Sequence, residues 1–437
     1  RRALGGPLPE GPSDPAAVVE GLARAADPGL VASAGPRYFG FVTGGALPAA
    51  LAADWLAAAW DQNAWALVAS PAAAVAEEIA SAWLVELFGL PQGTSTGFTT
   101  GATMASFTAL AAARHTVLRR AGHDVEEDGL AGAPPITVFV GEQVHATILA
   151  ALQMLGIGRG ASRARRVAAD AQGRMRPDAL RAALAASPPG PAIVCAQAGE
   201  VNTGAFDALE PIADAAAAHG AWLHVDGAFG LWAAVSPALR AHLAGVARAD
   251  SWTTDAHKWL NVPYDCGLVF VRDPQAHRAA VSFGAPYYVE SDAARDNFHW
   301  APDTSRRARG FAVYAALRSL GRRGLAALVE RCCAHARRFA ERLRAGGAEI
   351  VNDVVLNQVL VRFPAPPGVD PDAFQREVVR RVQEDGTCWL GGTTFRSRAA
   401  VRISVSSWAT TTEDVDRSAD AILHCARAAA AAQGRGV

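Results

Sequence analysis

The sequence predicts an α/β protein with a large, mostly parallel sheet and a smaller C-terminal α+β domain. Short β-branched runs alternate with alanine-rich helical segments between residues 136 and 273, which is typical of parallel strands joined by helices. Towards the C-terminus, the strand-like runs NQVLVRF and AVRISVSS accompany helical segments. We therefore expect an N-terminal segment at 1–45, a large domain at 46–308 and a small domain at 309–437.

Helices are expected to precede the first strand. In DPAAVVEGLARAAD, Asp14 stands where a helix N-cap is favoured and Pro15 stands at the first helical position. Helical segments are expected again at about 47–60, 71–89, 102–121 and, after the strands, 309–346. The expected strands of the large domain lie in ITVFVG, RARRVAAD, PAIVCAQA, AWLHVDGA, DSWTTDA and GLVFVRD.

Composition and charge argue against several classes of protein. The 437 residues are 51% hydrophobic and 19% charged, and 41 basic residues nearly balance 42 acidic ones, so nucleic acid is not an expected partner. The six cysteines lack CxxC spacing, and we expect no metal site. No apolar run approaches the roughly 18 residues of a membrane-spanning helix. We expect a cytoplasmic protein that binds no membrane.

Four features stand where strands are expected to end, and ligands of parallel sheets gather beyond those ends. A Gly/Thr loop, Thr100 to Thr103, precedes a helix whose free amides would favour an anion, although plain helix capping is the commoner role of such a loop. Asp226 ends the strand in AWLHVDGA, and His145 follows the strand in ITVFVG. Lys258 lies among aromatic residues in DAHKWLNVPYDCG.

Each feature alone has a structural alternative. The aspartate could cap a helix, the histidine could be a satisfied structural residue, and the lysine stem could cover neighbouring tryptophans. Together they match the needs of pyridoxal 5′-phosphate: backbone donors for its phosphate, a carboxylate for its pyridine nitrogen and an amine for its aldehyde. His145 and Ala228 could enclose the flat ring from its two faces. We therefore predict this cofactor.

The motifs, in this order, resemble those of the group II pyridoxal-phosphate-dependent decarboxylases, which include aromatic amino acid and glutamate decarboxylases. DAHKWLNVPYDCG is similar to that family's Schiff-base motif, HVDGAFG to its pyridine-nitrogen motif and FTTGATMASFTAL to its phosphate loop. GPRYFGFVTG resembles a segment of the substrate pocket, and VNTGAFDAL the segment after the central strand. The resemblance covers about residues 35 to 425.

The resemblance implies a type I aminotransferase-like fold with a seven-stranded sheet, a homodimer with its active sites at the subunit interface, and loss of an α-carboxylate as CO₂. It implies that Lys258 forms the Schiff base, Asp226 pairs with the pyridine nitrogen and His145 stacks on the ring. The remaining expected cofactor-binding residues are Thr100, Gly101, Ala102, Thr103, Ala228, Asp255 and His257. Thr43 would face the substrate, and Trp65 would lie near its side chain.

The chain departs from the family pattern at three places. Glu200 and Val201 stand where many members carry paired threonines. Asp255 stands where they have an asparagine, and a carboxylate near a phosphate must find a donor or point away. In the segment 284–308, Asn297 stands where aromatic amino acid decarboxylases place the tyrosine that protonates the intermediate after CO₂ leaves. His299, or Tyr287 and Tyr288, could donate that proton instead.

Three hypotheses follow. The first is a carbon–carbon lyase that decarboxylates an L-amino acid with an aromatic or other apolar side chain, because GFVTGGALP and DQNAWALVASP are mostly apolar; Arg396, Arg398 and Arg402 keep an acidic substrate open. The second couples decarboxylation to oxidative deamination, or performs other chemistry at Cα or Cβ in a biosynthetic pathway. The third is an inactive relative that binds or regulates, which the retention of Lys258 opposes.

Overall fold

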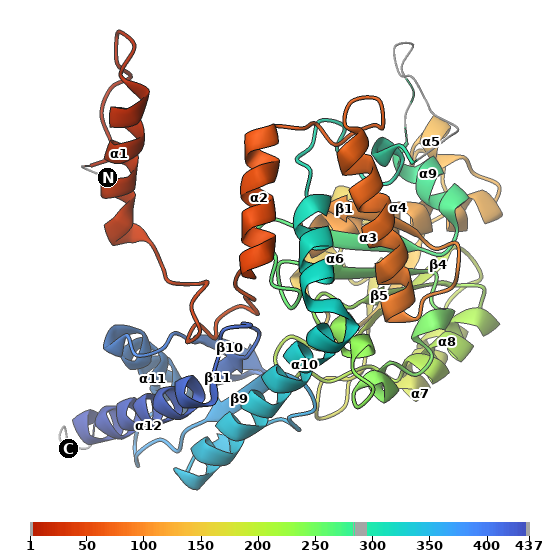
Figure 1. Ribbon diagram of the computed structural model, residues 1–437. Coiled ribbons are helices and arrows are strands. Elements are labelled where there is room, and N and C mark those ends of the chain that lie inside the picture. Colours follow the sequence, from red (N-terminus) through yellow and green to blue (C-terminus); the bar gives the residue numbers. More distant parts are fainter. Residues whose placement is uncertain (1–2, 283, 285–294, 434–437) are drawn as a thin grey trace.

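The computed structural model describes residues 3–282, 284 and 295–433, and its central feature is a seven-stranded sheet (Figure 1). The strand order is β1-β7-β6-β5-β4-β2-β3. The bounds are β1 Ser95–Thr99, β2 Thr137–Gly141, β3 Ala164–Val167, β4 Ala192–Gln197, β5 Trp222–Asp226, β6 Ser251–Asp255 and β7 Gly267–Val271. β7 runs antiparallel to both of its neighbours, and the other pairs are parallel. The expected mostly parallel sheet is confirmed.

Helices cover both faces of this sheet (Figure 1). Their bounds are α2 Pro48–Trp60, α3 Pro71–Phe88, α4 Ala102–Arg120, α5 Val125–Asp128, α6 Ala146–Met154, α7 Pro177–Ala185, α8 Leu209–Ala218, α9 Pro274–Val281 and α10 Gly310–Ala345. Alternate residues of β4 belong to different hydrophobic cores. Ile193 and Cys195 belong to the core that includes residues of α4 and α6. Val194 and Ala196 belong to the core that includes residues of α3, α7, α8 and α10. Burial on both faces explains why the strands are apolar without alternation.

β1 is a strand that the sequence analysis did not predict. Its residues, STGFT, are poor in the β-branched apolar types that mark strands, yet all five are buried. A Cβ at Gly97 would lie 1.9 Å from the carbonyl oxygen of Trp300, so only glycine fits there. β1 pairs with β7 from Ser95↔Val271 to Thr99↔Gly267, and it carries the chain directly into the loop before α4.

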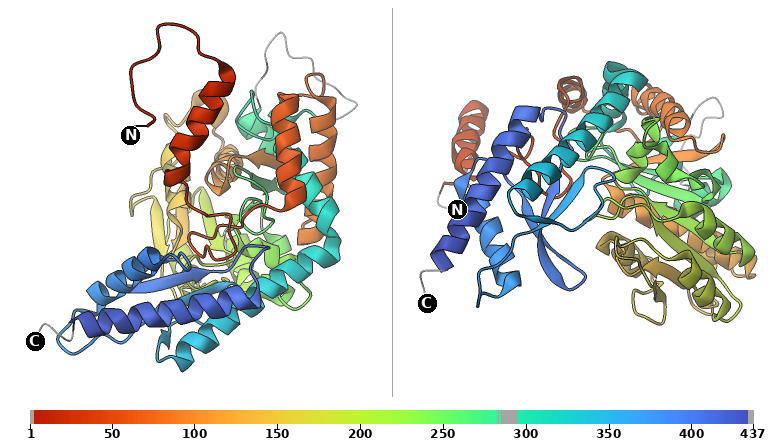
Figure 2. Two further views of the ribbon diagram at one scale, coloured as in Figure 1. Left: turned by 60° about the vertical axis from the view of Figure 1, so that its left-hand side comes forward. Right: turned by 90° about the horizontal axis from the view of Figure 1, so that it is seen from below.

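The small C-terminal sheet has four antiparallel strands in the order β10-β11-β9-β8. The bounds are β8 Glu349–Ile350, β9 Gln358–Arg362, β10 Gly391–Phe395 and β11 Arg398–Ser404, with α11 Pro371–Asp385 and α12 Thr412–Gln433 packed nearby (Figure 2). α10 links the two sheets, and Gly321 breaks it with φ 58° and ψ −179°. The expected long helix is therefore two helical pieces, because this backbone geometry lies outside the helical region.

α1, Pro15–Ala26, begins as expected: the Asp14 side chain accepts the Ala17 amide at 2.9 Å, and proline follows it. None of its residues is buried, and it stands apart from both sheets (Figures 1 and 2). The 3₁₀ helices are η1 Asp27–Gly29, η2 Gly230–Val235, η3 Arg240–Leu243, η4 Val246–Arg248 and η5 Asn297–His299. Within the described ranges, no helix is long and apolar enough to cross a bilayer.

Candidate active site

A cavity of about 390 Å³ lies beyond the carboxyl ends of β4, β5 and β6. The structure brings all ten residues that the sequence predicts for the cofactor to its wall: Thr100, Gly101, Ala102, Thr103, His145, Asp226, Ala228, Asp255, His257 and Lys258. Val201, noted above as a departure from the family pattern, also lines the cavity. Sequence reasoning missed the remaining lining residues, which are Thr147, Gln197, Gly199, Phe229 and Tyr264. The predicted groups converge because parallel strands end at one edge of the sheet.

Asp226 is the last residue of the buried strand β5, and its side chain is buried with it. One of its oxygens accepts the Ala228 amide at 3.1 Å. Burial raises the pKa of the Asp226 carboxyl above its ordinary range, and the nearby His145 and Lys258 oppose that rise. A positively charged ring N–H is the kind of partner that would stabilise this carboxylate.

Lys258 is held by charge rather than extended into solvent. Its Nζ lies 3.0 Å from Oδ2 of Asp255, and its side chain is 19% exposed. The other Asp255 oxygen, Oδ1, accepts the Ala102 amide at 2.6 Å. The structural alternative, in which the lysine only covers neighbouring tryptophans, is therefore not what the structure has. Lys258 is also the only lysine in the 437 residues, a signal that sequence reasoning passed over.

The segment that carries Lys258, residues 256–266, is called the lysine loop below. Asn261 fixes it: this residue has φ 56°, and its amide nitrogen donates to the carbonyl oxygens of Trp259 at 2.9 Å and Ser406 at 3.0 Å. Gly44 packs directly against it, because a Cβ there would lie 1.7 Å from the Lys258 carbonyl oxygen. The lysine loop is thus positioned by two distant parts of the chain, at Gly44 and at Ser406.

The hydrogen bonds of the two histidines in the cavity, His145 and His257, favour the neutral form of each imidazole. His145 caps α6 and accepts the Thr147 amide at Nδ1, at 3.3 Å. His257 accepts the Cys266 amide at Nδ1, at 3.1 Å. A nitrogen that accepts cannot carry a proton, so each ring is left with its proton on Nε2. Burial lowers the pKa of both histidines, which agrees with the neutral form.

Glu200, one of the departures from the family pattern, is buried and satisfied within its own turn. Its carboxylate accepts the amides of Asn202 at 2.9 Å and Thr203 at 2.8 Å, together with the Asn202 side-chain amide at 2.8 Å. Burial raises the pKa of the Glu200 carboxyl, and these hydrogen bonds oppose the rise. The neighbouring residue, Val201, lines the cavity, so this edge is more apolar than a threonine would make it.

Arg402 differs from the two arginines that precede it in FRSRAAVRIS. Arg396 and Arg398 are exposed, whereas Arg402 is partly buried, and its Nη1 donates to Oδ1 of Asn202 at 3.4 Å. Burial lowers the pKa of Arg402, and the charge of Glu200 opposes that effect. Arg402 in turn contributes to the lowered pKa of His145, which indicates that its charge acts across the cavity. A basic residue inside the apolar run AVRIS was the available signal.

Three predicted substrate-side residues do not line this cavity. Thr43 is buried, and it directly precedes Gly44, which packs against the lysine loop. Trp65 and His299 belong to a separate packing unit, in which the Phe298 amide donates to the Trp65 carbonyl at 2.8 Å and Nδ1 of His299 lies 2.6 Å from the Ser282 hydroxyl. Asn297 is buried there and donates to the Ala64 carbonyl at 3.2 Å.

The expected proton donors therefore stand away from the chain's own lysine, as far as the structure describes them. Neither His299 nor Asn297 is among the described residues around Lys258. Tyr287 and Tyr288 lie outside the described residues.

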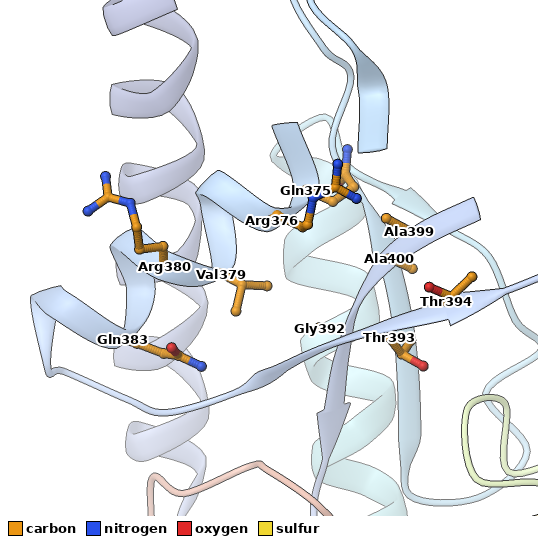
Figure 3. Close-up of a pocket in the computed structure, with 10 residues that line it drawn as sticks. All are labelled: Gln375, Arg376, Val379, Arg380, Gln383, Gly392, Thr393, Thr394, Ala399 and Ala400. Atoms are coloured by element: carbon orange, nitrogen blue, oxygen red, sulfur yellow. The ribbon is translucent and has the colours of Figure 1, made fainter. Parts of the chain in front are cut away.

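Another cavity of about 390 Å³ lies in the small domain, between α11 and the strands β10 and β11 (Figure 3). The described residues that line it include no carboxylate, histidine, lysine or cysteine. Two of its longer side chains are already paired: Arg380 with Glu377, and Gln383 with the Leu390 carbonyl. The cavity around Lys258, by contrast, is lined by two carboxylates, two imidazoles and an amine.

The residues around Lys258 fit pyridoxal phosphate. The first amides of α4 form an anion site, Asp226 is a buried carboxylate short of donors, and Lys258 supplies the amine. Ala228, a small residue beside Asp226, leaves room for a flat ring. The one poor match is Asp255, whose negative charge lies at the amide of Ala102.

The comparisons with known proteins agree with this fit. A family model described as the pyridoxal-dependent decarboxylase conserved domain matches residues 2–364. Tryptophan decarboxylase 1 of Oryza sativa subsp. japonica is 31% identical over 409 residues, which cover 87% of this chain and 78% of that protein. L-2,4-diaminobutyrate decarboxylase of Rhizobium meliloti (strain 1021) is 32% identical over 394 residues, which cover 86% and 75%.

Among solved structures, the crystal structure of Oryza sativa TDC with PLP and tryptamine is similar to this chain with a TM-score of 0.90. It is 26% identical in sequence, and the match covers 98% of this chain and 91% of that chain. The type I aminotransferase-like fold and the cofactor expected from the sequence are thereby confirmed. The chain belongs to the family of pyridoxal-dependent decarboxylases and is a pyridoxal-phosphate-dependent carbon–carbon lyase.

Proposed function

We propose that this protein removes the α-carboxylate of an aromatic L-amino acid as CO₂. The observation that carries the proposal is one cavity in which Lys258, Asp226 and His145 meet the first amides of α4. Bound pyridoxal phosphate supplies an aldehyde that joins to amines and a protonated ring that accepts the electron pair left by departing CO₂. In this proposal Lys258 holds the cofactor, Asp226 keeps the proton on the ring nitrogen and His145 lies against the ring.

The substrate class is inferred from the rest of the wall. Val201, Phe229 and Tyr264 give the cavity an apolar and aromatic side that suits an aromatic side chain. Arg402 is not among the described residues that line the cavity, but it is a partly buried cation that helps to lower the pKa of His145, so we propose that it orients a substrate carboxylate. Tryptophan decarboxylase 1 of rice, a relative across most of the chain, supports the aromatic class.

We also propose a homodimer. α1 has no buried residue, although Val18, Val19 and Leu22 are 54%, 66% and 56% exposed. On α2, Trp55 and Trp60 are 66% and 51% exposed. Apolar helix surfaces of this extent are typical of protein interfaces, and a second copy of the chain would cover them.

In a dimer, the predicted substrate-side residues that do not line their own chain's cavity could contact the substrate in the partner's cavity. Trp65 and His299 pack together with Phe298 on a unit separate from Lys258. In a dimer with its active sites at the interface, this unit would lie close to the partner's cavity. Trp65 would then contact the substrate side chain, and His299 would be positioned to donate a proton.

The division at residues 45 and 308 and a cytoplasmic location complete the proposal. The second boundary is supported by the start of α10 at Gly310, from which the chain leads to the small sheet. The location is supported by the six cysteines, all of which are unpaired and buried, as is usual in a reducing compartment.

The test is a product profile. The protein, loaded with cofactor, is incubated with L-tryptophan, L-tyrosine, L-phenylalanine, L-glutamate and L-2,4-diaminobutyrate, and CO₂, amine, aldehyde and peroxide are measured. We expect CO₂ and amine in equal amounts from an aromatic substrate. Turnover confined to L-glutamate or L-2,4-diaminobutyrate would contradict the substrate class, and aldehyde with peroxide would favour oxidative deamination instead.

A further inference from the structure

Asp255 occupies a place where an anion binds. Its Oδ1 accepts the amide of Ala102, the first residue of α4, at 2.6 Å. Its Oδ2 lies 3.0 Å from Nζ of Lys258. The side chain is buried, at 2% exposure, so it has no easy route to solvent. The Asp255 carboxylate thus accepts the Ala102 amide, which a phosphate would otherwise bind, and pairs with Lys258, the only lysine that lines the cavity.

The two histidines near Asp255 are poorly placed to take up a proton. Nε2 of His257 lies 3.6 Å from Oδ1 of Asp255 and carries that ring's proton, while Nδ1 of His257 accepts the Cys266 amide. Taking up a second proton would therefore set two N–H groups against each other. His145 is held neutral in the same way by Thr147.

The carboxylates outnumber the cations close to them. Asp226 and Asp255 both line the cavity, and Lys258 is the ammonium between them. Arg402 acts on His145 and is itself opposed by the buried Glu200. A phosphate monoester with a second pKa of about 6 carries two negative charges above that pH. At the start of α4 it would meet the carboxylate of Asp255, and the described residues that line the cavity include no cation besides Lys258.

We infer that Asp255 is an internal competitor of the cofactor's phosphate, so that cofactor binding takes up one proton and weakens as pH rises. The inference rests on the cofactor assignment. The added proton lies between the Asp255 carboxyl and a phosphate oxygen, where it turns a repulsion between two anions into a hydrogen bond. Asparagine in place of Asp255 would donate from its amide and need no such proton.

The sign of the pH dependence follows from linkage. Above about pH 6, the free phosphate monoester carries two negative charges and no proton, so a complex that holds one shared proton takes that proton from solvent. Each unit of pH then raises the dissociation constant up to about tenfold. The variant D255N loses this dependence and binds the cofactor more tightly at pH 8.

The experiment measures dissociation constants of pyridoxal phosphate and of pyridoxal between pH 6.5 and 8.5, by the visible absorption of the bound chromophore. Lys258 is the only lysine, so the titration reports a single side-chain amine. Pyridoxal lacks the phosphate and therefore reports any effect of D255N on Lys258 itself. The control D265N removes a carboxylate of the lysine loop that pairs with Arg309 and does not line the cavity.

For pyridoxal phosphate, we expect the pH slope of log Kd to be about one unit steeper in the unaltered protein and in D265N than in D255N. For pyridoxal, the slopes should agree. Equal slopes for pyridoxal phosphate in all three proteins would overturn the inference and leave the cofactor assignment standing. Failure of every protein to bind pyridoxal phosphate would instead refute the cofactor assignment.

A second measurement needs no variant and holds even if D255N does not fold. Calorimetry of the unaltered protein at pH 8, in two buffers of different ionisation enthalpy, counts the protons taken up on binding. We expect about one proton more for pyridoxal phosphate than for pyridoxal. Equal counts would overturn the inference.

Discussion

Replacing Gly44 by alanine should disable the site from a position that is not among the described residues lining the cavity. The added Cβ would lie 1.7 Å from the Lys258 carbonyl oxygen and 3.2 Å from that of His257. The closest ordinary carbon–oxygen contacts are about 3.3 Å, so the two backbones must separate by about 1.5 Å. A misplacement of about 1 Å at a reacting group can cost about 100-fold in rate. We therefore expect kcat/KM to fall by about 100-fold, together with weaker cofactor binding.

The matched control is G391A, because a Cβ at Gly391 meets nothing within 4 Å. Decarboxylation is assayed by CO₂ release at saturating cofactor, and folding is checked by circular dichroism and thermal unfolding. G391A should stay close to the unaltered protein. Activity of folded G44A within threefold of the unaltered protein would refute the claim that Gly44 positions the lysine loop.

Three further predictions concern single side chains. D226N should bind cofactor but lose on the order of 100-fold in kcat, because the ring nitrogen loses its counter-charge. The control D214N changes an exposed carboxylate of α8 and should keep its kcat. Near-normal kcat in D226N would remove Asp226 from the site. R306M leaves the buried Glu77 carboxylate without its partner and should lower the free energy of unfolding in urea by about 3–5 kcal/mol. R307M breaks only the more exposed pair with Asp54 and should cost about 1 kcal/mol or less; equal losses would contradict this reading. Burial lowers the pKa of His277 to about 3, so folded protein excludes a proton that unfolded protein binds below about pH 6.5, and stability falls as pH falls between those values. In H277Q this dependence should be shallower by about 1.4 kcal/mol per pH unit between pH 4 and 6, and an unchanged slope in urea unfolding would refute it.

The strands of the large sheet could be read from the sequence where the residues are apolar and β-branched. β1 escaped this reading because it contains no valine, isoleucine or leucine and its glycine has low strand propensity, which pairing with β7 overrides. The break of α10 at Gly321 was missed because glycine also occurs within continuous helices. For β1, the decisive contacts come from β7, which lies far away in the sequence.

The cofactor side of the site could be predicted because its groups lie at or just after the ends of strands, here β1, β2, β5 and β6. The topology of a parallel sheet brings such positions to one edge. The substrate side could not. Arg402 is turned inward by Asn202, which lies 200 residues earlier, and Tyr264 reaches the cavity through the path of the lysine loop. Trp65 packs against Phe298, the chain neighbour of His299, and no local sequence pattern reveals this contact.

The central claim is that Lys258 carries the cofactor in the cavity beyond the strand ends. The most direct test is to load the protein with pyridoxal phosphate, reduce it with borohydride and locate the added mass by peptide mass spectrometry. Because the chain has one lysine, the account predicts one modified side chain, at Lys258, and no cofactor-dependent activity in K258A. An unmodified Lys258 in active protein, or full activity of K258A, would contradict it.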